Sequence, residues 1–277
     1  AEYQGGRGAT VNLITKSGGN SMSGSIYGYY THESLKSDNT KGTPLEGETS
    51  GAKFSYEPGF NLGGALIKDR LWFFANVSYT YKEYYVPGYP ARSEEEIPRD
   101  DGEILPYLKF TYQPDQNNKF IISGSYSNRK IDQDGASRWK TENATNKYRS
   151  PKYNISAHWV ATHNSNFFTA LKLGYHNNEL NWYSKTEQSS IYDYDTYITS
   201  GGTGSNSYNP RRRFQANLDG TYFIDDWMGA HELKFGVQLQ YARTIWQNEY
   251  HGEDDGYGFK AGWKEYSGGQ HYTSWWY

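Results

Sequence analysis

The chain has 277 residues, and its 28 Lys and Arg against 31 Asp and Glu give a formal net charge of −3. This balance is neither the basic footprint of a nucleic-acid-binding protein nor the charge excess of a disordered acidic tail. The absence of cysteine excludes a disulfide scaffold and thiolate metal sites, and no apolar run approaches the ~18 residues of a membrane-spanning helix. Aromatic residues make up 18% of the chain, with 28 Tyr and 30 Gly, which is typical of strand-rich proteins that meet an interface.

Apolar and polar side chains alternate with a period of two through most of the chain, which predicts an all-β protein. A soluble sandwich or jelly roll would show the same alternation, so the period alone leaves the environment open. Strands are expected at Ser23–Thr31, Glu57–Ile67, Leu71–Tyr81, Glu103–Tyr112, Lys119–Arg129, Lys152–Thr162, Phe167–Tyr183, Arg211–Ile224 and His231–Tyr250.

The connections between these strands alternate in length. Tight turns are expected at Lys68–Arg70, Gln113–Asn118, His163–Asn166 and Asp225–Ala230, whereas the other connections run to roughly twenty residues or more. Regular alternation of this kind is typical of an antiparallel up-and-down transmembrane β-barrel with short periplasmic turns and long extracellular loops. The membrane barrel is therefore favoured over the soluble fold.

The last two strands fix the predicted orientation of the sheet, because a one-residue slip would swap every side chain between the two faces. The lipid side is expected to carry Phe214, Leu218, Leu233, Phe235 and Leu239, and the lumen side Gln215, Asn217, Lys234 and Gln238.

Residues 1–30, AEYQGGRGATVNLITKSGGNSMSGSIYGYY, resemble the junction where the plug of a TonB-dependent outer-membrane receptor ends and its barrel begins. Residues 59–81, GFNLGGALIKDRLWFFANVSYTY, resemble the second and third barrel strands of the Oar-like branch, and residues 231–241, HELKFGVQLQY, are similar to a later strand. The resemblance implies a plug inside a barrel of 22 strands in the outer membrane of a Gram-negative bacterium. It also implies transport of an unknown bulky substrate, energised by an inner-membrane energy-coupling protein.

This resemblance implies that residues 1–20 are the end of the plug and the plug-barrel junction, and that residues 21–277 are the N-terminal part of the barrel. Residues 9–15 are expected to form a plug strand, and Gly18 and Gly19 a hinge, because glycine tolerates positive φ without strain. About nine strands are visible, whereas 22 strands need about 220 residues in strand alone, so an internal fragment is expected. The final QHYTSWWY alternates its aromatic residues as a closing strand does, but Tyr272 stands where glycine would be expected.

The sequence offers no chemistry of catalysis. Residues Gly5, Gly6 and Gly8 are not followed by the Lys of a phosphate loop, and the seven histidines lack zinc-site spacing. Residues 132–135 imitate the start of a calcium loop without its later ligands. We therefore expect no enzyme activity, no cofactor, no metal site and no nucleic-acid partner.

Two groups of residues are candidates for function. Inward-facing residues that would contact the plug, water or a substrate are Lys109, Arg129, Lys172, Arg213, Asp219, Lys234 and Gln238, with plug contact or hydration favoured. Residues that would form an aromatic girdle at the lipid boundary, or contact a ligand in the loops, are Trp139, Trp182, Tyr192, Tyr194 and Trp246, with the girdle favoured for Trp182 and Trp246.

Two other functions remain open on the sequence. One is a small self-contained outer-membrane barrel that acts as an adhesin or structural protein, and the other is a soluble ligand-binding β-domain that stacks sugars on Trp and Tyr.

Overall fold

The computed structural model describes residues 15–37, 41–43, 46, 51–224, 228–252, 261–268 and 270–276. None of the helices in these ranges is long and apolar enough to span a membrane. The elements are β1 (Ser23–His32), η1 (Glu33–Leu35), β2 (Gly51–Ile67), β3 (Leu71–Tyr85), β4 (Arg99–Tyr112), β5 (Asn118–Asp134), η2 (Glu142–Ala144), β6 (Asn146–Asn164), β7 (Phe167–Ser184), β8 (Ser190–Asp193), β9 (Thr199–Gly201), β10 (Ser205–Ile224), β11 (His231–Thr244), β12 (Gln247–Tyr250), β13 (Ala261–Ser267) and β14 (Gln270–Trp276).

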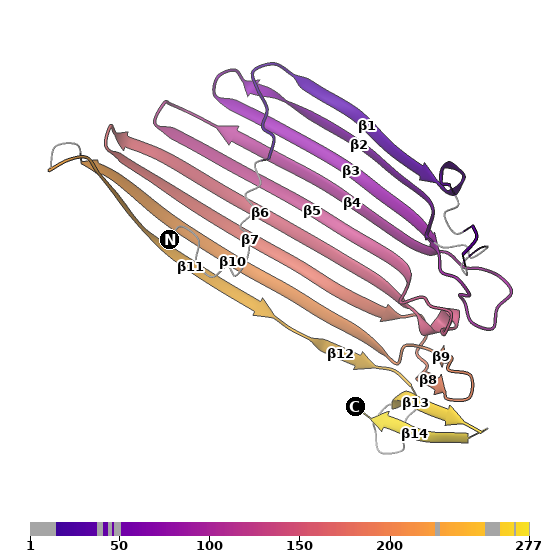
Figure 1. The fold of residues 1–277 in the computed structure, drawn as a ribbon. Coiled ribbons are helices and arrows are strands. Elements are labelled where there is room, and N and C mark those ends of the chain that lie inside the picture. The colour runs from indigo at the N-terminus through magenta and orange to yellow at the C-terminus, as the bar shows by residue number, and fades with distance from the viewer. Residues whose placement is uncertain are drawn as a thin grey trace.

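A ten-stranded antiparallel sheet forms most of the structure (Figure 1). Its order is β1-β2-β3-β4-β5-β6-β7-β10-β11, and β12 also pairs with β10. The prediction of an all-β, antiparallel, up-and-down fold is confirmed, and each predicted strand lies within an observed one. The exception is the last, which breaks at Ile245 and Trp246 into β11 and β12.

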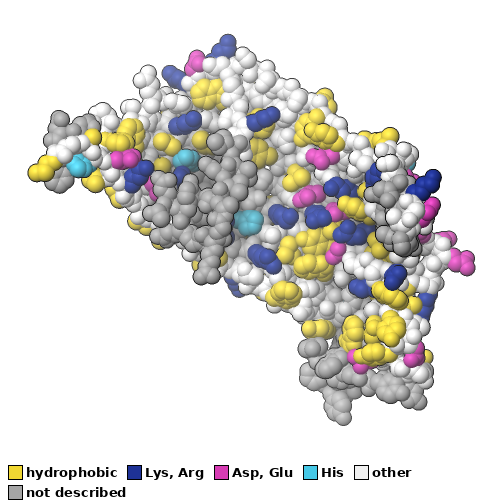
Figure 2. Space-filling model, viewed as in Figure 1, with side chains coloured by type: hydrophobic (Ala, Val, Ile, Leu, Met, Phe, Trp, Pro, Cys, Tyr) yellow, Lys and Arg dark blue, Asp and Glu magenta, His cyan; other side chains and the backbone are white. Residues whose placement is uncertain are grey.

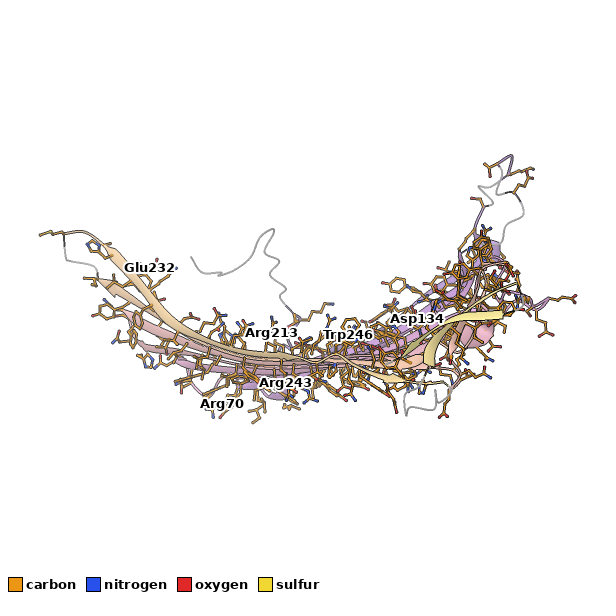
Figure 3. The ribbon with its side chains drawn as sticks, turned by 90° about the horizontal axis from the view of Figure 1, so that it is seen from below. Arg70, Asp134, Arg213, Glu232, Arg243 and Trp246 are labelled. Atoms are coloured by element: carbon orange, nitrogen blue, oxygen red, sulfur yellow. The ribbon has the colours of Figure 1, made fainter. Side chains whose placement is uncertain are left out.

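The sheet is curved into a trough, which Figure 3 shows edge-on. Arg213 lies on the concave side and Arg243 on the convex side. In the described part of the chain, β1 pairs only with β2 and β11 only with β10, so the sheet is an open arc of a barrel wall. The concave surface is called the inner wall below, and the convex surface the outer face.

The strands are longer than a crossing of the lipid requires. β6, β7 and β10 have 19, 18 and 20 residues, whereas roughly 9 to 11 residues cross a bilayer. The extra length lies at the end with the long loops, where strand pairing continues beyond the apolar band. The loops are correspondingly shorter than expected, with residues 86–98 and 135–145 left between strands.

A second sheet lies beyond this end of the first, with the order β14-β13-β8-β9. It joins the β7–β10 connection to the C-terminal hairpin through the parallel pair β8–β13, which the sequence analysis did not predict. The expectation that the last residues do not close the barrel agrees with this arrangement, because β14 pairs with β13.

Few side chains are fully buried, because a single sheet has no interior between layers. Tyr89, Ala91, Ile131, Ala144 and Ala161 are the buried apolar residues of the described part. Many of the larger apolar side chains stand exposed on the outer face instead, as at Leu239, which is 64% exposed. That exposure is what a lipid-facing surface requires.

Candidate functional site

The inner wall is built from transverse rows to which each strand contributes one residue that faces the concave side, and most of these residues are polar. One such row runs through Phe74, Lys109, Ser123, Ser156 and then Gly174 on five successive strands. Figure 2 shows this face, with Lys and Arg side chains gathered over the loop-side half and acidic side chains between them. The registers place all of the predicted lumen residues on this wall: Lys109, Arg129, Lys172, Arg213, Asp219, Lys234 and Gln238.

The predicted lipid-facing residues alternate along each strand with those of the inner wall and therefore lie on the outer face. Phe214 pairs with Tyr241 and Leu218 with Val237, and both pairs lie between the polar pairs of the inner wall. Toward the tight turns, the rings of Phe120 and Trp159 stack on this outer face with centroids 6.1 Å apart. Aromatic residues at this level form the belt that strands show where they leave the lipid, and the sequence analysis did not single these two out.

The segment that precedes β1 lies against the inner wall. Tyr107 on β4 donates its hydroxyl hydrogen to Thr15 Oγ1 at 2.9 Å. Lys109 Nζ lies 3.2 Å from the Thr15 carbonyl oxygen and 3.1 Å from Thr15 Oγ1, and its side chain is only 9% exposed. Residues 15–20, called the entry segment below, therefore dock on the concave side of the sheet.

Gly18 crosses the wall so closely that no other residue would fit there. A Cβ atom added to Gly18 would lie 2.2 Å from the carbonyl oxygen of Phe73 and 2.8 Å from the backbone of Gly64. A Cβ atom added to Gly19 would meet nothing within 4 Å. The structure thus separates the two residues expected to form a hinge: Gly18 permits a close approach, and Gly19 has open space.

Asn20 fastens the end of the entry segment to the tight turn between β2 and β3. Its Oδ1 accepts hydrogen bonds from the backbone N–H of Asp69 at 3.0 Å and from Trp72 Nε1 at 2.8 Å. Its amide nitrogen donates to Asp69 Oδ1. Asp69 has a φ of 62°, so Asn20 supports a turn whose backbone is in the left-handed region. The sequence analysis missed this role, because nothing local marks an asparagine that binds a turn 49 residues away.

Ionic pairs fill the inner wall toward the loops. Arg129 holds Asp101 through Nε at 2.9 Å and Nη2 at 2.5 Å. Ser127 donates to Glu103, whose carboxylate also lies 4.0 Å from Lys152 Nζ. Charges at this level are paired within the wall.

Trp182 belongs to this inner network. Its Nε1 donates to Asp134 Oδ2 at 3.1 Å, and its ring lies 5.2 Å from that of Tyr148. It faces inward, not toward the outer face where a girdle residue would lie, because it lies ten positions after the inward-facing Lys172 on the same strand and side chains alternate with a period of two. Asp134 also accepts a bond from Arg99, so its carboxylate is held by protein donors.

The charged residues nearer the tight turns are held more loosely. Lys172 Nζ lies 3.9 Å from Asp219 Oδ2, with both side chains more than half exposed. Lys234 Nζ lies 3.5 Å from Glu232 Oε1. At this exposure such pairs contribute little to stability.

A polar hollow of about 240 Å³ opens on the middle of the inner wall. Its lining includes Tyr107, which also binds the entry segment, together with His176, Arg213 and Gln215 on the neighbouring strands. The hydroxyl, amide and guanidinium groups there present both donors and acceptors to the lumen.

The loop aromatics lie in three different settings. The guanidinium carbon of Arg138 lies over the Trp139 ring, 4.8 Å from the centroid of that ring. Tyr192 on β8 stacks on Trp263 and meets Tyr194 edge-on, and the Tyr194 hydroxyl donates to Glu265 at 3.0 Å. Tyr192 and Tyr194 thus hold β8 and the residue that follows it against β13 in the second sheet.

Trp246 lies at the break between β11 and β12 and is 68% exposed. Its Nε1 donates to Asn248 Oδ1 at 3.2 Å. This exposure at the free edge of the sheet leaves its girdle role a prediction.

Asp193 anchors the loop between β8 and β9. It accepts hydrogen bonds from Arg92 Nη2 at 2.9 Å and from the backbone N–H groups of Asp195 and Thr196. Burial opposes ionisation of this carboxyl group, but hydrogen bonds from the Thr196 side chain, from the backbone of Asp195 and Thr196 and from Arg92 outweigh it and hold the pKa of Asp193 below its ordinary value.

The fold and its two faces define the class of protein. Residues 14–85 match the family model of the outer membrane beta barrel domain. The chain is an all-β outer-membrane barrel chain, located in the outer membrane of a Gram-negative bacterium. This class points to a barrel or transporter, not to an enzyme.

A more particular similarity covers a short stretch. Over 87 residues the chain is 31% identical to the TonB-dependent transporter Oar of Myxococcus xanthus. The aligned stretch is 30% of this chain and 8% of that transporter, so the chain spans a small part of the curated relative. No solved structure matches the chain.

Proposed function

We propose that this chain forms part of the wall, and the plug-barrel junction, of a TonB-dependent transport protein that moves a bulky solute across the outer membrane. Residues 1–20 are the end of the plug in this proposal, and residues 21–277 belong to the barrel. The plug strand expected at residues 9–15 lies, except for Thr15, outside the described residues. The observation that carries the proposal is the entry segment, which runs along the inner wall from the β2–β3 turn to Lys109.

The hydrogen bonds between the entry segment and the inner wall can hold this segment in place at rest and still break when the plug is pulled. The neutral hydrogen bond from Tyr107 to Thr15 contributes about 0.5–1.5 kcal/mol net and one from the Lys109 ammonium about 1.5–3 kcal/mol, because water replaces each bond when it breaks. A pull from the periplasm could therefore release the contact with Tyr107 and Lys109 without unfolding the sheet. The energy-coupling protein of the inner membrane is the partner that would supply that pull.

The inner wall supports a hydrated path for a solute. Lys172, Arg213, Asp219, Lys234 and Gln238 share the inner wall. In this proposal that wall faces the lumen, where water or the plug satisfies charges that lipid would reject by about 2–4 kcal/mol at mid-bilayer. In this proposal they contact plug and water, and the loop aromatics meet the solute before it enters. The relative named above is a transporter, which agrees with this function.

These 277 residues contain no cysteine, and any cysteine elsewhere in the full-length protein is first replaced with serine. In the full-length protein, Thr15→Cys and Tyr107→Cys are introduced together, and a short bismaleimide is added to cells. We expect cross-linking in de-energised cells and a clear fall in yield when the inner membrane is energised and the coupling protein is present.

The matched control joins two wall strands. Ser123 and Ser156 lie with their hydroxyl oxygens 2.8 Å apart, so Ser123→Cys with Ser156→Cys should cross-link equally in both states. A Thr15–Tyr107 yield that does not respond to energisation would contradict the transport proposal. That result would favour a passive barrel that serves as an adhesin or structural protein.

A further inference from the structure

The outer face of β10 and β11 changes abruptly from apolar to basic. Five successive cross-strand pairs on this face carry no charge, and the next pair toward the loops is Arg212 opposite Arg243. The uncharged pairs are Tyr222–Leu233, Gly220–Phe235, Leu218–Val237, Ala216–Leu239 and Phe214–Tyr241.

The arginine pair lies at the level of the lipid head groups. From Leu233 to Tyr241 the strand rises about 27 Å at ~3.4 Å per residue, and a tilt of ~40° reduces this to a height of about 21 Å. The apolar band of an outer-membrane barrel is about 25 Å tall. Arg212 and Arg243 follow two residues beyond the end of the apolar pairs, so they stand at its extracellular edge.

Two like charges directly opposite each other on one face of a sheet repel. Arg212 Nε donates to Asn177 Oδ1 at 3.3 Å, which leaves the outer nitrogens of its guanidinium unused. Within the described part of the chain, neither Arg212 nor Arg243 forms an ion pair, and Arg243 has no hydrogen-bond partner. Asn177, which accepts this bond from Arg212, donates in turn to Glu179 Oε1 at 3.4 Å, so the described residues offer the arginine pair a carboxylate only through Asn177.

A second basic pair on the same face shows the contrast. Lys130 on β5 lies opposite Arg149 on β6. Asp132 provides a carboxylate for this pair, because its Oδ1 accepts a hydrogen bond from Arg149 Nη2 at 2.8 Å. Among the described residues, one basic pair thus has a direct ion pair with a carboxylate, and the Arg212–Arg243 pair has none.

We propose that Arg212 and Arg243 bind the phosphate group of a phosphorylated lipid in the outer leaflet. Guanidinium groups present paired N–H donors that match phosphate oxygens, and a shared anion would turn their repulsion into attraction. The uncharged pairs below them supply a surface for the acyl chains.

This site is separate from the inner wall. Its lipid would hold the extracellular edge of β10 and β11 at a fixed depth, whatever passes through the lumen. The proposal does not rest on the proposed transport function and can fail independently of it.

The test measures lipid binding to the full-length protein in detergent by native mass spectrometry. The probes are a lipid A that carries two phosphates and the same lipid after removal of its phosphates. For R212Q/R243Q, we expect about 30-fold weaker binding of the phosphorylated lipid, equivalent to about 2 kcal/mol at ~1 kcal/mol per basic residue near a membrane surface. The dephosphorylated lipid should bind the original protein and the variant equally.

The neighbouring arginines provide a control of equal charge. Arg211 and Arg213 flank Arg212 in sequence but face the inner wall, so R211Q/R213Q should leave lipid binding unchanged. Heat-modifiable migration in SDS gels confirms folding of each variant. If the outer double variant does not fold, R243Q alone is used, with about fivefold weaker binding expected.

Three results would overturn the proposal. The first is unchanged binding in the outer variant, and the second is an equal loss in the R211Q/R213Q control. The third is displacement of the lipid by inorganic phosphate at equal concentration, which would show a site for a free anion.

Discussion

Replacing Val237 with arginine tests which face of the sheet meets lipid. Val237 is 62% exposed on the outer face, opposite Leu218 and midway between Leu233 and Tyr241. Four residues in either direction at a tilt of ~40° correspond to about 10 Å, so Val237 lies near the midplane of the apolar band. An arginine there costs about 2–4 kcal/mol, because its charge has no water to solvate it. The folding equilibrium constant should fall about 30-fold to about 700-fold.

The matched control is the next residue. Gln238 faces the inner wall opposite Asn217, so Gln238→Arg should change the free energy of unfolding by less than about 0.5 kcal/mol. Tyr241→Arg, at the edge of the band, should cost about 0–1 kcal/mol. The assay is guanidinium unfolding of the full-length protein in lipid vesicles, followed by tryptophan fluorescence. An equal cost at Val237 and Gln238, or a larger one at Gln238, would refute the assignment of the faces.

Four further predictions follow from the contacts of the entry segment, the loops and the sheet edges. Gly18→Ala should displace the entry segment and cost about 1–3 kcal/mol, because the added methyl group overlaps a backbone oxygen, whereas Gly19→Ala should not; limited proteolysis of residues 15–20 distinguishes the two. Asn20→Ala should cost about 1–3 kcal/mol by leaving turn donors unpaired, and unchanged stability in thermal unfolding would contradict the role of Asn20 in holding the β2–β3 turn. Because the pKa of Asp193 is lowered, its contribution to loop stability is present above the ordinary carboxyl pKa and is lost as pH falls through the lowered value, which hydrogen exchange of β8 should show. Residues 1–277 refolded alone should form no heat-modifiable barrel, since the unpaired edges of an open sheet cost several kcal/mol per group in hydrocarbon; a protease-resistant, heat-modifiable species would oppose this.

The alternation of side chains was sufficient to predict the wall. It located the strands of the large sheet and placed Phe214 and Gln215 on opposite faces, because a period of two fixes the phase along a whole strand. Strand ends were predicted less well. The apolar alternation stops at Tyr241 while pairing with β10 continues to Tyr250, since hydrogen bonding of the backbone does not need apolar side chains.

Features that depend on distant pairing could not be predicted. β8 and β13 are joined in parallel, with Ser190 opposite Trp263, and no local signal links two such segments. Asn20 and Asp69 meet only because the entry segment returns over the wall. The inward direction of Trp182 was within reach, because counting from Lys172 along β7 gives its face, whereas nearness to a strand end does not.

The most direct test of the account is a cryo-electron microscopy structure of the full-length protein in a lipid nanodisc. We expect a closed barrel in which β1 to β7, β10 and β11 are consecutive wall strands. Lys109 and Arg213 should face the interior, and Thr15 should lie against Tyr107 inside the barrel. A structure with Leu218 and Leu239 facing the interior, or with residues 15–20 outside the barrel, would contradict the account.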